Sequence, residues 1–186
     1  MKTPLCNFCL KSGIFCPQCQ EEIRLGKVSE VDIRVAKILT QLERTYPPLQ
    51  KISFYKAYEV KDILAIVVGL GEAQYLMEYE GRILKDIQKR VGKRVKVLEK
   101  GGKTRKFLED LFKPVSITTI NTIWLPDGSI ETRVILPTRA KRLPADVETL
   151  LKLAKNIRGI TLRIEFQRSS RVPLKIKTRR SYQKRP

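Results

Sequence analysis

The chain has 186 residues, 42% of them hydrophobic, and 38 Lys and Arg against 19 Asp and Glu give it a net charge of +19. This composition excludes a disordered chain, and no apolar run reaches the roughly 20 residues needed to cross a bilayer. Because the N-terminus lacks a basic segment followed by a long apolar stretch, we expect a cytoplasmic protein without a membrane partner.

The excess of basic residues predicts a polyanionic partner. Cations that neutralise phosphates release counterions, which favours binding to nucleic acid. The alternative is the charge-rich surface of a heat-stable protein, but such surfaces mix both signs to form ion pairs. A twofold excess of cations therefore favours nucleic acid.

All four cysteines lie in one short stretch near the N-terminus, "LCNFCLKSGIFCPQC". They form two C-x-x-C pairs, a pattern that brings four thiolates together around a structural Zn²⁺ with no open coordination position. A reducing cytoplasm disfavours stable disulfides, and redox C-x-x-C motifs occur singly. Since six residues separate the pairs, we expect residues 1–25 to form a very small hairpin with almost no core of its own. The predicted ligands are Cys6, Cys9, Cys16 and Cys19.

The body of the chain begins with a helix predicted over residues 29–44, which Ser29 and Asp32 open as a capping box. Alternating apolar residues predict a strand at 52–60, and the continuous apolar run at 63–68 predicts a buried strand. The elements predicted next are a short helical piece at 72–77, a helix at 82–91 that Gly92 ends, and a strand at 93–98. The resulting order is α-β-β-α-α-β.

The same order returns after Gly101-Gly102, a predicted hinge. The elements are a helix at 104–113, strands at 115–125 and 129–136, a helical piece at 138–143, a helix at 147–157 and a strand at 160–166. Gly92 and Gly159, which end the long helix of each copy, are 67 positions apart. One small α+β module is therefore used twice.

Residues 63–99 carry a family resemblance in the stretch "ILAIVVGLGEAQYLMEYEGRILKDIQKRVGKRVKVLE". It resembles the core of a KH domain, whose motif matches Gly81, Leu84, Ile87, Gly92, Val95 and Val97. With a cysteine module ahead of two repeats, residues 1 to about 166 resemble archaeal NusA-like RNA-binding proteins that have an N-terminal zinc ribbon and tandem KH domains. The resemblance implies a zinc-binding module at 1–25, KH-like domains at 29–100 and 103–166, and a basic flexible tail at 167–186.

The loops depart from the KH pattern, in which G-x-x-G lets RNA phosphates approach the bare backbone. The first repeat has Glu78-Tyr79-Glu80-Gly81, and the second has Ala145-Asp146-Val147-Glu148 with no glycine. Because carboxylates repel phosphates, the resemblance transfers the fold better than the mode of binding.

Basic residues gather in three places that we predict to bind RNA. Arg82, Lys85 and Lys89 fall on one face of the 82–91 helix, and Lys93 extends that line. The alternative for this stripe is a solvated helix face. The remaining predicted residues are Arg90, Arg94 and Lys96, which widen the stripe, Arg139, Lys141 and Arg142 beside the second loop, and Lys175, Lys177, Arg179 and Arg180 in the tail.

The sequence predicts no enzyme activity, because it contains no histidine and no catalytic motif that we recognise.

Three functions stay open. The NusA-like resemblance implies contact with nascent RNA or RNA polymerase in transcription elongation or termination. A ribosome-associated or ribosomal protein that binds rRNA would share the small zinc module and the basic extension. The third is a protein-interaction scaffold without direct RNA binding, whose acidic loop at 78–80 would suit a basic partner.

Overall fold

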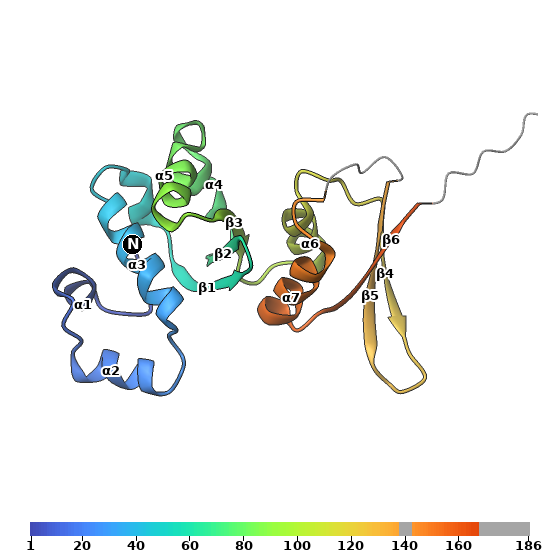
Figure 1. The fold of residues 1–186 in the computed structure, drawn as a ribbon, viewed down its shortest axis with the longest axis horizontal. Helices are drawn as coiled ribbons and strands as arrows, with labels where there is room; N and C mark the ends of the chain where they lie inside the picture. Colours follow the sequence, from blue (N-terminus) through green and yellow to red (C-terminus); the bar gives the residue numbers. More distant parts are fainter. Residues whose placement is uncertain (138–142, 168–186) are drawn as a thin grey trace, which may run out of the picture.

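The computed structural model describes residues 1–137 and 143–167 and has an α+β fold, as predicted. The described residues form two three-stranded sheets, with helices α6 (Thr104–Phe112) and α7 (Val147–Arg158) between them (Figure 1). Within these ranges, no helix combines the length and the hydropathy needed to cross a membrane. The predicted helical piece at 138–143 lies almost entirely outside the described residues, and so does the tail from residue 168.

The cysteine segment forms two short helices, α1 (Asn7–Ser12) and α2 (Pro17–Arg24), so the predicted hairpin is wrong. Each helix begins directly after the first cysteine of a pair, and Pro17 occupies the first turn, where its missing N–H costs nothing. The segment has almost no core of its own, as expected. Cys9, Leu10 and Cys19 are buried in the same core as the helix that follows.

Helix α3 (Glu30–Leu42) starts with the predicted capping box. The Asp32 N–H donates to the Ser29 hydroxyl at 3.2 Å, and the Ser29 N–H donates to the Asp32 carboxylate at 2.8 Å. Asp32 is buried, and its second oxygen accepts a hydrogen bond from the Ala57 N–H. The cap therefore also fixes the helix against strand β1 (Phe54–Val60). A 3-10 turn, η1 (Pro47–Lys51), leads to that strand.

The first sheet contains β1 (Phe54–Val60), β2 (Ile63–Val68) and β3 (Arg94–Glu99), in that order. β1 is antiparallel to β2, and β2 is parallel to β3. The parallel connection runs through α4 (Ala73–Met77), η2 (Tyr79–Gly81) and α5 (Arg82–Val91). The chain leaves α5 through Gly92 at a φ of +70°, a left-handed conformation that glycine adopts without strain.

The second sheet repeats this arrangement. Its elements are α6 (Thr104–Phe112), β4 (Thr119–Trp124), β5 (Ile130–Leu136), α7 (Val147–Arg158) and β6 (Thr161–Phe166). β4 is antiparallel to β5, which is parallel to β6. The predicted strand at 115–125 is shorter than expected, because the backbone turns at Val115, whose N–H bonds to the Phe112 carbonyl.

Strand β2 divides its side chains between two cores, which explains its continuous apolar run. Leu64, Ile66 and Val68 belong to the core under α3 and α5. Ile63 and Ala65 point to the opposite face and join the core of α6, α7 and the second sheet. The first sheet is therefore covered on both faces, and the copies of the module are packed together.

Candidate metal site and basic surface

The four cysteine sulfurs converge on one point, with all Sγ atoms within 4.8 Å of one another. Cys6 Sγ lies 3.1 Å from Cys9 Sγ and 3.8 Å from Cys19 Sγ. Four thiolates around one tetrahedral metal ion at about 2.3 Å would be roughly 3.8 Å apart, so the cluster fits a metal ion. The structure thus brings together the four cysteines that the sequence predicts as ligands.

Backbone donors hold the two pairs against each other. The Cys16 N–H donates to Cys9 Sγ at 3.1 Å, and the Cys6 N–H donates to Cys19 Sγ at 3.5 Å. Each donor belongs to the first cysteine of one pair and reaches the second sulfur of the other. Such bonds stabilise thiolates, the form in which cysteine binds metal.

The outer face of α5 carries basic side chains without strong partners. Arg82 and Lys85 are exposed, and neither forms a side-chain hydrogen bond or ion pair among the described residues. Lys89 is 79% exposed and approaches Asp86 only to 4.0 Å. We call Arg82, Lys85 and Lys89 the α5 face. Its charges are available to a ligand.

The other predicted residues near α5 have internal partners. The Lys93 ammonium donates to the Glu59 carboxylate at 2.5 Å, and Arg94 donates to the Pro144 carbonyl at 3.0 Å. Lys96 donates to the Lys113 carbonyl at 3.0 Å, and burial lowers its pKa to about 8. Arg90 donates to the Gln41 amide oxygen at 2.6 Å. The predicted stripe therefore ends at the C-terminus of α5.

The other two basic clusters lie outside the described residues. They are Arg139, Lys141 and Arg142, and Lys175, Lys177, Arg179 and Arg180.

The loop before α5 has an unusual backbone that the sequence did not reveal. Tyr79 and Glu80 have φ angles of +55° and +54°, values that non-glycine residues rarely adopt. The Tyr79 ring packs edge-on against Tyr46 with a centroid distance of 5.4 Å, and the Tyr46 hydroxyl donates to Asp86 at 2.7 Å. These contacts hold the loop while Glu78 and Glu80 stay exposed.

A groove of about 420 Å³ lies beside α5, bounded also by α4, β3 and α6. Leu84, Val95 and Val97 supply apolar lining, and the charged residues are Lys96, Lys106, Lys113, Glu99 and Asp110. The Lys113 ammonium pairs with the Asp110 carboxylate at 2.6 Å. The Glu99 carboxylate, itself buried, accepts a hydrogen bond from Lys106 at 2.8 Å. The sequence did not predict the groove, because α6 is distant from α4 along the chain.

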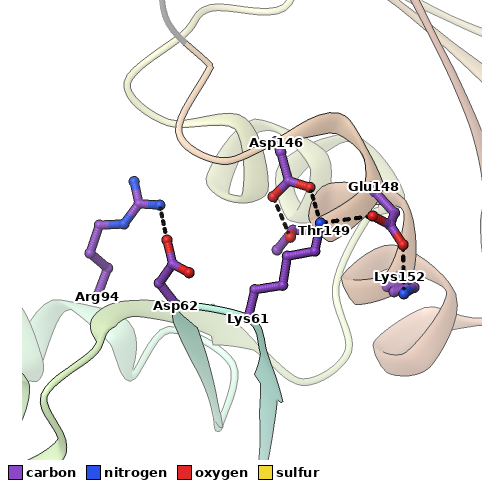
Figure 2. Close-up of polar contacts among 7 residues, drawn as sticks. All are labelled: Lys61, Asp62, Arg94, Asp146, Glu148, Thr149 and Lys152. Atoms are coloured by element: carbon purple, nitrogen blue, oxygen red, sulfur yellow. Dashed lines mark hydrogen bonds and ion pairs between the residues drawn. The ribbon is translucent and has the colours of Figure 1, made fainter.

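The predicted second loop is largely the start of a helix, because Asp146 is the N-cap of α7 and Val147 and Glu148 form its first turn. This segment contacts the first copy of the module. Figure 2 shows Lys61, from the β1–β2 turn, between Asp146 and Glu148, with its ammonium 2.7 Å from both carboxylates. Hydrogen bonds from Lys61 lower the pKa of Asp146 to about 2. Lys152 and then Lys61 lower the pKa of Glu148 to about 2. Asp146 and Glu148 thus bind a lysine of the same chain.

No protein-family model matches the chain, and no curated protein matches its sequence. The fold does match solved structures. One is the crystal structure of APE1850, which aligns with a TM-score of 0.51 and 16% identity over 71% of this chain and 96% of that chain. At this identity the likeness shows a common fold alone.

Proposed function

We propose that the protein is a non-catalytic RNA-binding protein that contacts phosphates through the α5 face. The observation that carries this proposal is the set of three exposed cations, Arg82, Lys85 and Lys89, which lack strong acidic partners within the described part of the chain. On a chain of net charge +19, many cations pair internally, as Lys93 and Arg94 do. The free cations of the α5 face can therefore attract a polyanion.

The KH resemblance gives this face a role. In a KH domain, RNA passes over the loop between two helices, and the backbone of that loop contacts phosphates. Here α4 and α5 flank Glu78–Gly81, and the sheet behind them has one antiparallel and one parallel pair. This order supports a KH-like assignment for residues 29–100. The matching second sheet supports the same assignment for 103–166.

The groove beside α5 offers a place for bases. An unstacked base can lie on Leu84, Val95 and Val97, while its phosphate meets the α5 face. Lys96 adds positive charge to the groove, whereas Lys106 and Lys113 pair with the acids Glu99 and Asp110 that also line it. This arrangement favours single-stranded RNA, because its unpaired bases are free to enter the groove.

For the cellular role, we propose transcription elongation or termination, as the NusA-like resemblance implies, with nascent RNA as ligand and RNA polymerase as partner. Association with the ribosome is the second candidate. The contact of Lys61 with Asp146 and Glu148 favours it, because a closed second loop leaves shape and phosphate recognition as the means of binding. Crosslinking in the native cell, followed by sequencing, separates the two. Nascent transcripts support the first role, a few rRNA positions support the second, and a scaffold without RNA contact gives no RNA crosslinks.

We further propose that the four thiolates hold a structural Zn²⁺, the ion that a tetrahedral set of soft ligands prefers. Cys6 is the exposed member, so Cys6→Ala removes one ligand with little loss of core packing. We expect metal analysis of the purified protein to find zinc, and Cys6→Ala to lower both zinc content and melting temperature. The exposed Ser12→Ala is the control. A well-folded wild type without zinc would contradict the assignment.

RNA binding is tested by fluorescence anisotropy with a labelled single-stranded RNA of about five nucleotides. Lys85→Glu with Lys89→Glu should weaken binding about tenfold or more and reduce the dependence of log affinity on log salt by roughly one to two. The control is Lys2→Glu with Lys103→Glu, which changes net charge equally at exposed positions outside the α5 face and the groove lining. If wild type fails to bind RNA even at low salt, the proposed function is wrong.

A further inference from the structure

A second basic hollow lies between α1 and α3. It has a volume of about 290 Å³ and is lined by Leu10, Lys11, Lys37, Thr40, Gln41 and Arg44. We call it the α1–α3 pocket. Among the described residues that line it, three are cationic and none is acidic.

The charges of this pocket are not neutralised from nearby. Lys11 and Arg44 are exposed, and within the described ranges their side chains form no hydrogen bond or ion pair. The Lys37 ammonium lies 6.0 Å from the Phe15 ring centroid, a contact that leaves its charge intact. Glu43, next to Arg44, binds the N-terminal ammonium at 2.8 Å. Three like charges around one hollow repel one another, and an anion between them would relieve this repulsion.

The pocket continues the α5 face. Gln41 lines the pocket and accepts a hydrogen bond from Arg90, which follows Lys89 on α5. Helices α3 and α5 are in direct contact. A chain of phosphates that follows Arg82, Lys85 and Lys89 therefore reaches the pocket over Arg90.

An exposed aromatic ring next to this cluster points to RNA as the polyanion. Phe8 is 72% exposed and lies three residues before Lys11 on α1, so the two side chains share one side of that helix. Single-stranded RNA is held by this combination, in which a cation binds the phosphate and a ring stacks on the base.

We propose that the α1–α3 pocket binds the phosphodiester backbone of the same RNA strand beyond the α5 face, with Phe8 stacking on a base. The cysteine segment then has a second role besides holding a metal, because it carries Lys11 and Phe8 into the path of the RNA. This inference rests on the proposed RNA binding through α5. If the inference is right, an RNA long enough to cover both the α5 face and the α1–α3 pocket binds more tightly than an RNA that covers the α5 face alone.

The test uses the full chain and labelled oligouridine of about 5 and about 15 nucleotides, near the footprint of one module and of an extended strand. The main variant is Lys11→Gln, Lys37→Gln and Arg44→Gln together. We expect it to weaken binding of the longer RNA at least about fivefold, to reduce its salt dependence by roughly two, and to leave the shorter RNA unaffected. Phe8→Ala should weaken the longer RNA alone, by about 1–3 kcal/mol of stacking, a factor of roughly five or more.

The outcomes separate the two proposals. If the longer RNA binds the triple variant as well as it binds wild type, the pocket proposal is wrong while RNA binding through α5 still stands. If wild type binds neither RNA at low salt, both proposals fail. The exposed single change Lys11→Glu gives the same test with the least risk to folding, and circular dichroism checks that each variant is folded.

Discussion

Both copies of the module carry acidic residues near the start of the longer helix and use them differently. Glu78 and Glu80 precede α5, whereas Asp146 is the N-cap of α7 and Glu148 lies in its first turn. Glu78 and Glu80 in the first copy are exposed and have no ion-pair partner among the described residues. Asp146 and Glu148 in the second copy both bind Lys61 of the first. Asp146 and Glu148 therefore serve the contact between the two copies, whereas the loop with Glu78 and Glu80 stays open to a ligand.

The third strands of the two sheets differ as well. Lys96 on β3 and Arg163 on β6 are 67 positions apart, as Gly92 and Gly159 are. Lys96 lies under α6, where burial lowers its pKa to about 8, whereas Arg163 is exposed and pairs with Glu165 at 3.1 Å. The neighbours of each copy thus decide how a basic residue at this position behaves. The predictions below test these differences.

The largest effect on stability is expected at Lys96. The pKa of this amine is about 8 in the folded state and about 10.4 in the unfolded chain. Below pH 8 the lysine is charged in both states, so burying the charge destabilises the fold. Lys96→Met should therefore raise the free energy of unfolding at pH 7 by roughly 1–2 kcal/mol, after allowance for partial exposure.

Urea unfolding at pH 7 and at higher pH checks this sign. The unfolded chain binds more protons than the folded one between about pH 8 and pH 10.4, so the stability of wild type should rise over that range relative to Lys96→Met. Arg163→Met is the matched control at the equivalent position of β6, and it should not stabilise. If Lys96→Met is less stable than wild type at pH 7, the buried charge of Lys96 on β3 does not destabilise the fold, and the contrast with Arg163 on β6 is wrong.

The next effect concerns the first loop. Glu78→Gly with Glu80→Gly removes two negative charges where phosphates approach, and glycine adopts the +54° φ angle of residue 80 without strain. Single-stranded RNA should then bind about tenfold more tightly, measured by anisotropy. Asp146→Asn with Glu148→Gln removes the same charge from the second loop. An equal gain in this control would mean that net charge, and not the first loop, sets the affinity.

Much of the framework could be predicted from local sequence. Ser29 with Asp32 gave the start of α3, and the run 63–68 gave a strand that is buried along its whole length. The positions of the four cysteines gave a metal-compatible cluster, because the spacing of C-x-x-C pairs is a local property. These features depend on residues that are neighbours along the chain.

The errors and omissions come from contacts between distant segments. The cysteine segment forms two helices and not the predicted hairpin, and its Cys9 and Cys19 pack in the core that α3 also lines. Lys93 was placed in the basic stripe, but Glu59, 34 positions away, binds it. The groove and the α1–α3 pocket were missed for the same reason, since each is formed by helices that meet only in the folded chain.

A smaller effect is expected at Lys61, which joins the copies. Lys61→Met removes two ion pairs between side chains that are about half exposed. Exposed pairs contribute little to stability, so the melting temperature should fall by no more than a few degrees. Lys103→Met, at an exposed position without a described partner, is the control and should leave the melting temperature unchanged. A larger fall would mean that the two ion pairs stabilise the fold more than exposed pairs usually do.

The smallest effect is the response of the same cluster to acid. The pKa values of Asp146 and Glu148 are lowered to about 2, below their unfolded values of about 3.9 and 4.3. The stabilisation from these carboxylates is therefore complete above about pH 5 and is lost as the pH falls toward 2. Because Lys61 contributes to both shifts, Lys61→Met should lose stability less steeply between about pH 5 and pH 2 than wild type, in thermal unfolding followed by circular dichroism. No matching change is expected from Glu78→Gln with Glu80→Gln, since those carboxylates lack a described cationic partner. Equal acid profiles for wild type and Lys61→Met would mean that Lys61 does not stabilise the ionised loop, and the contrast between the two loops would then need another cause.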